Sequence, residues 1–347
     1  MVNKVKTKSA TKHVGTLTIK PANSWIDESV KNPDPKRYFN DLIVQFENTV
    51  IFAATNVGKS ILATQICEDI AQTEKVLYVD LELSGKQFQL RYTDTETGKV
   101  YRFSPNLERA EITPENMMGT DPGKAILDSI EEAAKQGTKF FVIDNLTCVC
   151  NNIERGKQAG DFMQRLIMLK KKYGITTVVI AHTPKRKSKG NITQADLAGA
   201  SKLINLFDEG IALARSAKDD NLRYLKQVKV RTGECKYGDD NVLLLDLSKE
   251  NGFLRFEVIG VGCEDEHLNM FEDENEEDKL MTILSLHKEG KTVREIAAIV
   301  GLGKSTVQRR LEYAKKANIT IPEESEKSVH FVPAGTMGQA NGRTYVA

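Results

Sequence analysis

Apolar residues along this chain fall into short runs with two alternating kinds of spacing. Runs rich in β-branched and aromatic residues, typical of buried strands, occupy 50–53, 75–83, 139–145, 176–183 and 209–215. Apolar residues at helical spacing occupy 61–71, 124–136, 161–173 and 200–207. Strands that are apolar throughout and separated by helices predict an α/β fold, a mostly parallel sheet with helices on both faces.

Beyond residue 215 the pattern changes twice. Three consecutive strands at 222–231, 241–247 and 253–259 predict an antiparallel extension of the same sheet. Residues 279–316 then show three helices, broken at 289–292 and 301–304, which is the spacing of a small all-α helix-turn-helix domain. Its expected core is Ile296, Ala297, Val300, Val307 and Leu311, and Gly301 suits the tight turn.

Charge and composition divide the chain further. The net charge is only +1, but residues 1–30 form a basic leader that we expect to be disordered, and 264–278 form an acidic stretch that we expect to be an extended linker. The predicted organisation is therefore an α/β domain at 31–263, a helical domain at 279–318 and a flexible tail at 319–347. No apolar run reaches the roughly 20 residues of a membrane helix, so a cytoplasmic protein without membrane contact is expected.

The five cysteines show no zinc-ligand spacing. We expect reduced thiols, with a metal or disulfide role for Cys148 and Cys150 as the alternative.

The strongest chemical signal is the loop after the first strand. Its spacing fits a phosphate-binding P-loop, with alanine in place of the usual first glycine, and a chance match is the alternative. Lys59 is expected to reach the β- and γ-phosphates of ATP, and the Ser60 hydroxyl to bind Mg²⁺. The predicted nucleotide-binding residues are Ala53, Ala54, Thr55, Asn56, Val57, Gly58, Lys59, Ser60 and Ile61.

Polar residues end three of the other predicted strands, at the sheet edge where ligands bind in such folds. Asp144 is placed as a Walker B carboxylate that orders Mg²⁺, with a helix cap or turn residue as the alternative. Glu82 is a candidate for activating the attacking water, and Asp80 is its rival. His182 could sense the γ-phosphate or serve a purely structural purpose.

Taken in order, these motifs and the Lys229-Val-Arg231 segment resemble the RecA/DnaB superfamily of oligomeric ATPases. The resemblance covers roughly residues 45–260 and is closest to the RepA-type helicase-like ATPases of plasmids and other mobile elements. It favours Glu82 over Asp80 as the catalytic carboxylate and His182 as the phosphate sensor. It implies a ring, expected to be a hexamer, in which Lys229 and Arg231 reach the neighbouring subunit's nucleotide; an exposed basic strand is the alternative.

Two features suggest DNA as a partner. The loop after His182 carries Lys185, Arg186, Lys187 and Lys189, which suit the phosphates of single-stranded DNA, with a solvated charge run as the alternative. In the last predicted helix, Lys304, Gln308, Arg309 and Arg310 could read duplex DNA in a major groove, unless the helical domain docks a protein instead.

The sequence thus predicts an ATP- and Mg²⁺-dependent DNA helicase or translocase of a mobile element, working with replication-initiation partners. An ATP-switched DNA-binding regulator or loader is the main alternative. A P-loop enzyme acting on a small molecule is a further one, which the basic loop and the helical domain disfavour.

Overall fold

The structure is a computed structural model that describes residues 11–112, 121–146, 155–183, 190–197, 203–268, 274–316 and 319. The chain divides into two compact units, Met1–Asn269 and Met270–Ala347, and each is treated by itself.

Within the described residues of the first unit, a nine-stranded sheet has the order β13-β12-β11-β10-β5-β9-β8-β6-β7. Its parallel strands are β5 (Asn48–Ala53), β6 (Val76–Asp80), β7 (Leu107–Ala110), β8 (Phe140–Asp144), β9 (Thr176–His182) and β10 (Glu209–Arg215). The predicted mostly parallel α/β sheet is confirmed. Sequence reasoning did not include the short edge strand β7.

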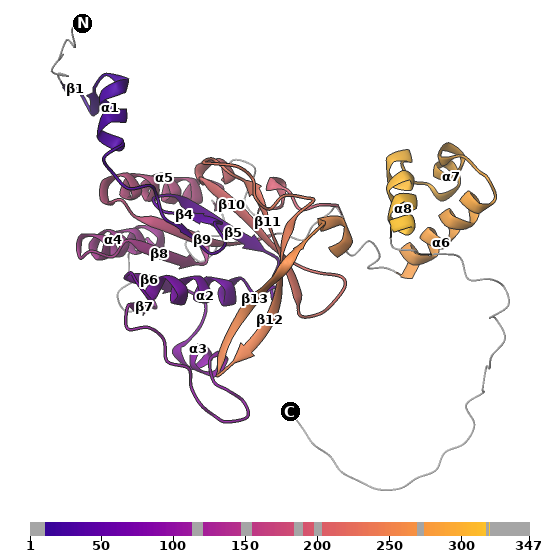
Figure 1. Ribbon diagram of the computed structural model, residues 1–347, viewed down its shortest axis with the longest axis horizontal. Helices are drawn as coiled ribbons and strands as arrows, with labels where there is room; N and C mark the ends of the chain where they lie inside the picture. The colour runs from indigo at the N-terminus through magenta and orange to yellow at the C-terminus, as the bar shows by residue number, and fades with distance from the viewer. Residues whose placement is uncertain are drawn as a thin grey trace, which may run out of the picture. The chain divides into compact units, whose positions relative to one another are not determined.

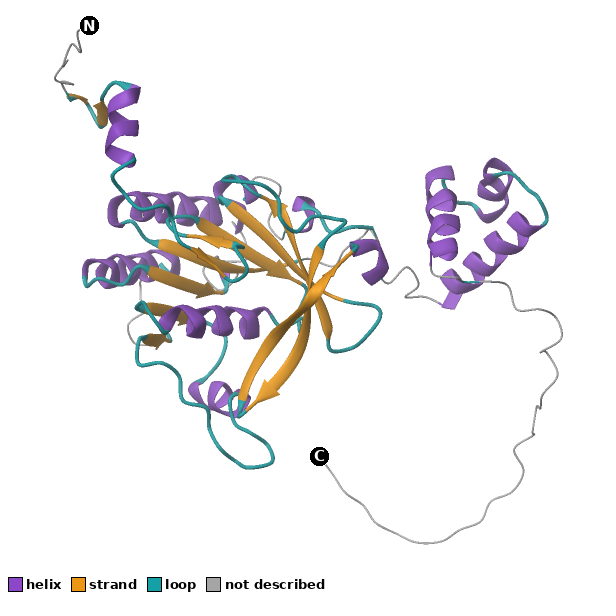
Figure 2. Ribbon diagram, viewed as in Figure 1, coloured by secondary structure: helices purple, strands orange, loops and turns teal. Residues whose placement is uncertain are grey.

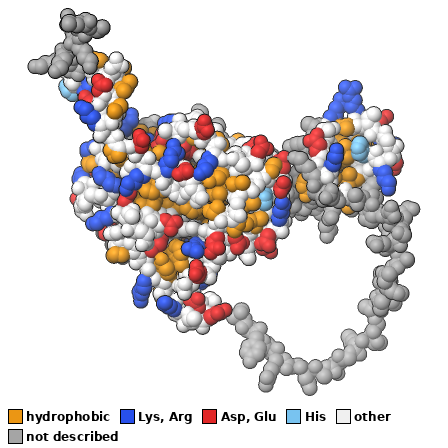
Figure 3. Space-filling model, viewed as in Figure 1, with side chains coloured by type: hydrophobic (Ala, Val, Ile, Leu, Met, Phe, Trp, Pro, Cys, Tyr) orange, Lys and Arg blue, Asp and Glu red, His pale blue; other side chains and the backbone are white. Residues whose placement is uncertain are grey.

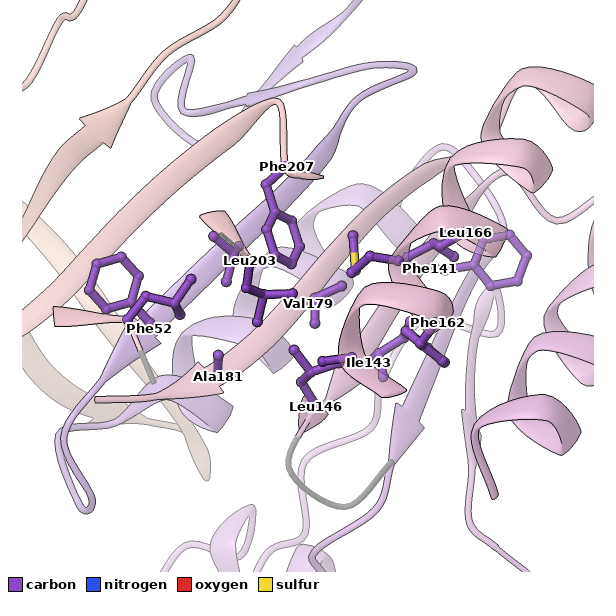
Figure 4. Close-up of a cluster of buried hydrophobic side chains, with 14 of the residues drawn as sticks. Phe52, Phe141, Ile143, Leu146, Phe162, Leu166, Val179, Ala181, Leu203 and Phe207 are labelled. Carbon is purple, nitrogen blue, oxygen red and sulfur yellow. The ribbon is translucent and has the colours of Figure 1, made fainter. Parts of the chain in front are cut away.

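Helices pack on both faces of this sheet because successive residues of each central strand point to opposite sides. Val50 and Phe52 contribute to the core under α4 (Pro122–Lys135) and α5 (Arg155–Tyr173), whereas Ile51 and Ala53 contribute to the core under α2 (Lys59–Ala71). Figure 1 shows α4 and α5 on one side of the strands and α2 on the other. Figure 4 shows the first of these cores, to which strands contribute residues such as Val179 and α5 contributes Phe162 and Leu166.

The antiparallel extension is also confirmed. It consists of β11 (Leu222–Lys229), β12 (Val242–Glu250) and β13 (Phe253–Gly262), which add to the sheet beyond β10. Figure 2 shows β12 and β13 as the long paired strands of this region. Because β11 runs antiparallel to β10, it starts at the carboxyl edge of the parallel strands and ends at their amino edge.

The predicted helix at 200–207 is not observed. Residues 200–202 lie outside the described part of the chain, and Ile204–Leu206 form only one turn of 3₁₀ helix (η4). A second short turn, η3, covers Gln194–Asp196, and the short helix α3 covers Gly85–Arg91.

The expectation of a disordered leader over 1–30 is wrong for its described part. A hairpin of β1 (Lys12–Val14) and β2 (Leu17–Ile19) precedes α1 (Ala22–Ser29), and a second pair, β3 (Arg37–Tyr38) and β4 (Ile43–Val44), follows. The residues of both strands of the hairpin are exposed. Exposed hydrophobic side chains lie along residues 12–30 (Figure 3). They include Leu17, Trp25 and Val30, which are 63%, 46% and 78% exposed.

The acidic segment 264–278 is not the fully extended linker that its charge predicts. Glu264 opens a 3₁₀ turn (η5, Glu264–His267), and its carboxylate is completely buried. It accepts hydrogen bonds from Lys226 Nζ at 2.5 Å and from the Ile192 N–H at 2.9 Å. The buried Lys226 ammonium thus binds Glu264, the first residue of the acidic segment, within the α/β unit.

The second unit contains three helices in its described part, α6 (Glu274–Lys288), α7 (Val293–Val300) and α8 (Lys304–Lys316). Helix α6 begins five residues earlier than predicted. The predicted core residues pack together with Ile283 and Leu286. Thr292 caps α7 in a capping box with Glu295, and Gly301 ends it with φ 67°.

No helix among the described residues is long and apolar enough to cross a membrane.

Candidate nucleotide site

The P-loop connects the last residue of β5, Ala53, to the first residue of α2, Lys59. Asn56 has φ 60°, and Gly58 has φ 114°. A Cβ atom on Gly58 would lie 2.6 Å from Cζ of Phe256, so this position requires glycine for both conformation and space. The loop therefore has the strand, turn and helix order in which N–H groups and a helix N-terminus receive phosphate.

Lys59 lies inside this loop and is 6% exposed. Its Nζ donates hydrogen bonds to the carbonyl oxygens of Ala53, at 3.3 Å, and Ala54, at 2.9 Å. Burial lowers the pKa of Lys59, and the carboxylates of Asp144 and Glu82 partly oppose that shift. The Lys59 ammonium group therefore lies inside the loop. The phosphate oxygens of a bound nucleotide would replace the two backbone carbonyls as its hydrogen-bond acceptors.

Asp144 ends β8 beside the P-loop and is 1% exposed. Its Oδ2 accepts a hydrogen bond from the Tyr78 hydroxyl at 2.8 Å, while its buried Oδ1 has no partner among the described residues. Burial raises the pKa of Asp144 to about 6, although the hydroxyls of Ser60 and Tyr78 pull it down. The buried Asp144 carboxylate and the neighbouring Ser60 hydroxyl are oxygen ligands of the kind that Mg²⁺ binds.

The two rival carboxylates after β6 have different surroundings. Asp80 is 2% exposed, forms an ion pair with Arg109 at 2.8 Å, and accepts hydrogen bonds from the Glu82 and Leu83 N–H groups. The Glu82 side chain is 39% exposed and lies 3.5 Å from Nε2 of His182. The Asp80 carboxylate therefore stabilises the turn after β6, whereas the Glu82 carboxylate is exposed enough to contact a substrate water.

Asn145 joins these residues, and sequence reasoning missed it. This residue is fully buried directly after Asp144, and its Nδ2 donates a hydrogen bond to Oε1 of Glu82 and lies 3.0 Å from Nε2 of His182. The strands β5, β9, β8 and β6 are adjacent, so their carboxyl ends bring Ala53, His182, Asp144 and Asp80 into one row. Its position directly after Asp144, the predicted Walker B carboxylate, is the one sequence signal that could have pointed to Asn145.

Lys229 and Arg231 lie at the opposite edge of the sheet. Lys229 ends β11 and pairs with Gly210 near the start of β10, and Arg231 binds Asp208, which accepts the N–H of the first residue of β5. That residue, Asn48, and the P-loop are separated by the length of β5, about 16 Å at the rise of a strand. Lys229 and Arg231 therefore lie far from the P-loop of their own chain.

Two other arginines, which sequence reasoning also missed, lie next to the P-loop. Arg215 ends β10 and donates to the carbonyl of Asn56 at 2.6 Å, and Arg223 near the start of β11 donates to the carbonyl of Val57 at 3.0 Å. The two residues are paired in the β10–β11 register. They fix the outer side of the loop through its backbone.

Comparisons with known proteins agree with this geometry. A family model described as an AAA domain matches residues 16–188. A solved DnaB-like replicative helicase, studied with its interactions with primase, is 14% identical with a TM-score of 0.52, and the match covers 67% of this chain and 65% of that one. The fold is RecA-like.

A second solved structure, which is an ATPase domain by itself, is similar as well, with a TM-score of 0.50, 13% identity, and coverage of 67% of this chain and 95% of that one. No curated protein matches the sequence. The chain spans just under two thirds of the length of the DnaB-like helicase structure. Together the family model and the fold support a RecA-like P-loop ATPase domain in the first unit.

The predicted DNA-binding residues have different outcomes in this RecA-like protein. Lys185, Arg186, Lys187 and Lys189 lie outside the described residues, as do Cys148 and Cys150. Lys304 and Gln308 are exposed on α8, and the side chain of Arg309 is not described.

The prediction that Arg310 could read duplex DNA is wrong, because this residue is buried and only 6% exposed. It falls three residues after Val307 and four before Ala314, so the helical period turns it to the packed face of α8.

Proposed function

We propose that this RecA-like protein is an ATP-hydrolysing motor that assembles into a ring and moves along single-stranded DNA, as a helicase or translocase of a plasmid or mobile element. The observation that carries this proposal is the division of the site: the P-loop lies at the carboxyl edge of the sheet, and the cation pair Lys229 and Arg231 lies at the amino edge. Copies arranged edge to edge would bring the two halves together.

Each described residue of the site has a role in this proposal. Lys59 and the P-loop N–H groups bind the triphosphate, and Glu82 orients the attacking water and accepts its proton. Ser60 and Asp144 would hold Mg²⁺, which neutralises charge on the phosphate oxygens when bound. Lys229 and Arg231 of the adjacent subunit stabilise the charge that develops on the transferred phosphoryl group.

His182 links this chemistry to DNA. It contacts Asn145, and one residue after it the chain enters the basic loop 184–189. A change at the γ-phosphate is passed through Glu82 and Asn145 to the strand that carries this loop. The four basic residues of the loop track backbone phosphates, so their neutralisation should weaken strand binding and flatten its salt dependence.

The decisive experiment measures ATPase rate with and without single-stranded DNA, beside the mass of the assembled protein. We expect strong stimulation by the single strand, a ring mass several times that of the 38.7 kDa chain, and ATP-dependent displacement of a labelled strand. A monomer whose ATPase ignores DNA would refute the motor.

A second candidate, an ATP-switched DNA-binding regulator or loader, is favoured by the three-helix unit. Helix α7, the turn at Gly301 and helix α8 have the sequence spacing of a helix-turn-helix, and Lys304 and Gln308 are exposed. A regulator would bind duplex DNA with an affinity set by nucleotide and would turn over little ATP. Strand displacement separates the two candidates.

A further inference from the structure

Asp208 is a buried carboxylate at the amino edge of the sheet, outside the phosphate-binding residues. It is 4% exposed and accepts three hydrogen bonds, from the Asn48 N–H at 2.9 Å, Lys170 Nζ at 2.5 Å and Arg231 Nη1 at 2.7 Å. Burial alone would raise the pKa of Asp208, but the Asn48 N–H and the Lys170 ammonium outweigh it and hold that pKa below its ordinary value. The group is therefore a fixed anion.

Arg231 uses only part of its hydrogen-bonding capacity on this anion. Its side chain is 55% exposed, with Nη1 on Asp208 and a longer contact of 3.4 Å from Nη2 to the carbonyl of Asn205. A guanidinium has five N–H groups in a planar fork, so it can hold one carboxylate and still present N–H groups to a phosphate. Asp208 and a phosphate need not compete for Arg231.

Lys229 is held by the same short segment. Its Nζ donates to the carbonyl of Ile204 at 2.8 Å. Opposite it, the pairing of β10 and β11 shifts register after Gly210, where a Cβ atom would lie 3.2 Å from Cβ of Lys229. A bulge of this kind re-aims a neighbouring side chain. The acceptors named here for Lys229 and Arg231 therefore all come from residues 204–208. They are the carbonyls of Ile204 and Asn205 and the carboxylate of Asp208.

This inference rests on the proposed shared site. We propose that Asp208 is a positioning residue that fixes the Arg231 guanidinium at the subunit edge, in place to meet the nucleotide of the adjacent subunit. Lys170 keeps Asp208 ionised and in position from the other side. A misplacement of about 1 Å costs on the order of 10²-fold in rate, less than loss of the arginine itself.

The test is Asp208→Asn in the full chain, which keeps an acceptor for the Asn48 N–H and removes the charge. We expect kcat for DNA-stimulated hydrolysis to fall about 10- to 100-fold with KM for ATP unchanged, because the variant's own P-loop is intact. Mixing with Lys59→Ala subunits, which carry an intact Asp208 and Arg231, should restore turnover. A variant that merely misfolds would not be rescued.

Two further variants complete the test. Lys170→Gln removes the other cation from the same carboxylate and should lower kcat by less than Asp208→Asn, since Arg231 keeps its own contact with Asp208. Asp208→Glu keeps the charge, moves the carboxylate by one methylene, and should also lose less than Asp208→Asn. Full activity of Asp208→Asn, or a defect without rescue while Arg231→Ala is rescued, would overturn the inference. If Arg231→Ala itself is not rescued, the shared site fails and this inference fails with it.

Discussion

The two edges of the central sheet handle charge in opposite ways. At the carboxyl edge, Lys59 and Asp144 are 6% and 1% exposed, enclosed by the P-loop and the strand ends. At the amino edge, Arg231 is more than half exposed and stands on a buried carboxylate, Asp208. The first edge is shaped to enclose a ligand, and the second is shaped to offer a cation outwards. In the proposed shared site, phosphoryl transfer uses groups from both edges.

The direction of β11 is the cause of this division. Arg223, near its start, binds the P-loop, whereas Lys229, at its end, lies at the opposite edge. One antiparallel strand therefore carries cations to both sites. In the proposed shared site, hydrolysis would therefore depend on assembly.

The largest expected effect comes from the enclosed edge. Lys59→Ala should reduce ATP hydrolysis to background and weaken nucleotide binding, because the ammonium that meets the β- and γ-phosphates is removed. Lys124→Ala, an exposed lysine at the start of α4, is the matched control. Retained turnover in purified Lys59→Ala protein would contradict the P-loop assignment.

At the open edge, Arg231→Ala should slow hydrolysis about 10³- to 10⁵-fold while ATP still binds. Activity should return when this variant is mixed with Lys59→Ala subunits, since each supplies what the other lacks. Lys236→Ala, an exposed lysine paired with Asp41, should leave the rate unchanged. Absence of recovery in the mixture would show that the two edges do not meet.

A third comparison lies within the carboxyl edge. Glu82→Gln should lower kcat about 10²- to 10⁴-fold without lowering the melting temperature, because this carboxylate is exposed to the substrate water. Asp80→Asn should instead destabilise the fold by about 1–3 kcal/mol, because it removes the buried partner of Arg109, which then depends on Glu111 and the Leu83 carbonyl. Kinetics and thermal melting of the two variants distinguish them, and a stable, inactive Asp80→Asn would reverse the assignment.

The smallest effect concerns Glu209, at the amino edge and 1% exposed. Burial, followed by the Glu47 carboxylate, raises its pKa from 4.5 to about 8. The folded chain keeps this proton up to pH 8 and the unfolded chain releases it near 4.5, so the group's contribution to stability is full below pH 4.5 and is lost as pH rises through 8.

Glu209→Gln should therefore flatten the fall in melting temperature between about pH 5 and pH 8, and should raise it at pH 8 by roughly 2–8 °C. Glu257→Gln, an exposed residue of β13, is the control. Melting curves that shift in parallel at all pH values would rule out titration of Glu209.

The sequence by itself determined the features that depend on neighbouring residues. The alternation of apolar strands and helices predicted the layered α/β fold, and strand, turn and helix around Gly58, Lys59 and Ser60 predicted the P-loop. The apolar spacing in 279–316 predicted the core of the three-helix unit. These features could be predicted because side-chain periodicity and turn chemistry act over a few residues.

Only the tertiary structure decided which residues meet. It brought Asn145 between Glu82 and His182, paired Asp80 with Arg109, buried Glu264 on Lys226, and turned Arg310 into the packing of its unit. It also took Lys229 and Arg231 to the edge opposite their own P-loop. The physical reason is that strand order and direction bring together residues that are far apart in the chain. Burial then determines whether a charged side chain is enclosed by the protein or exposed to a partner.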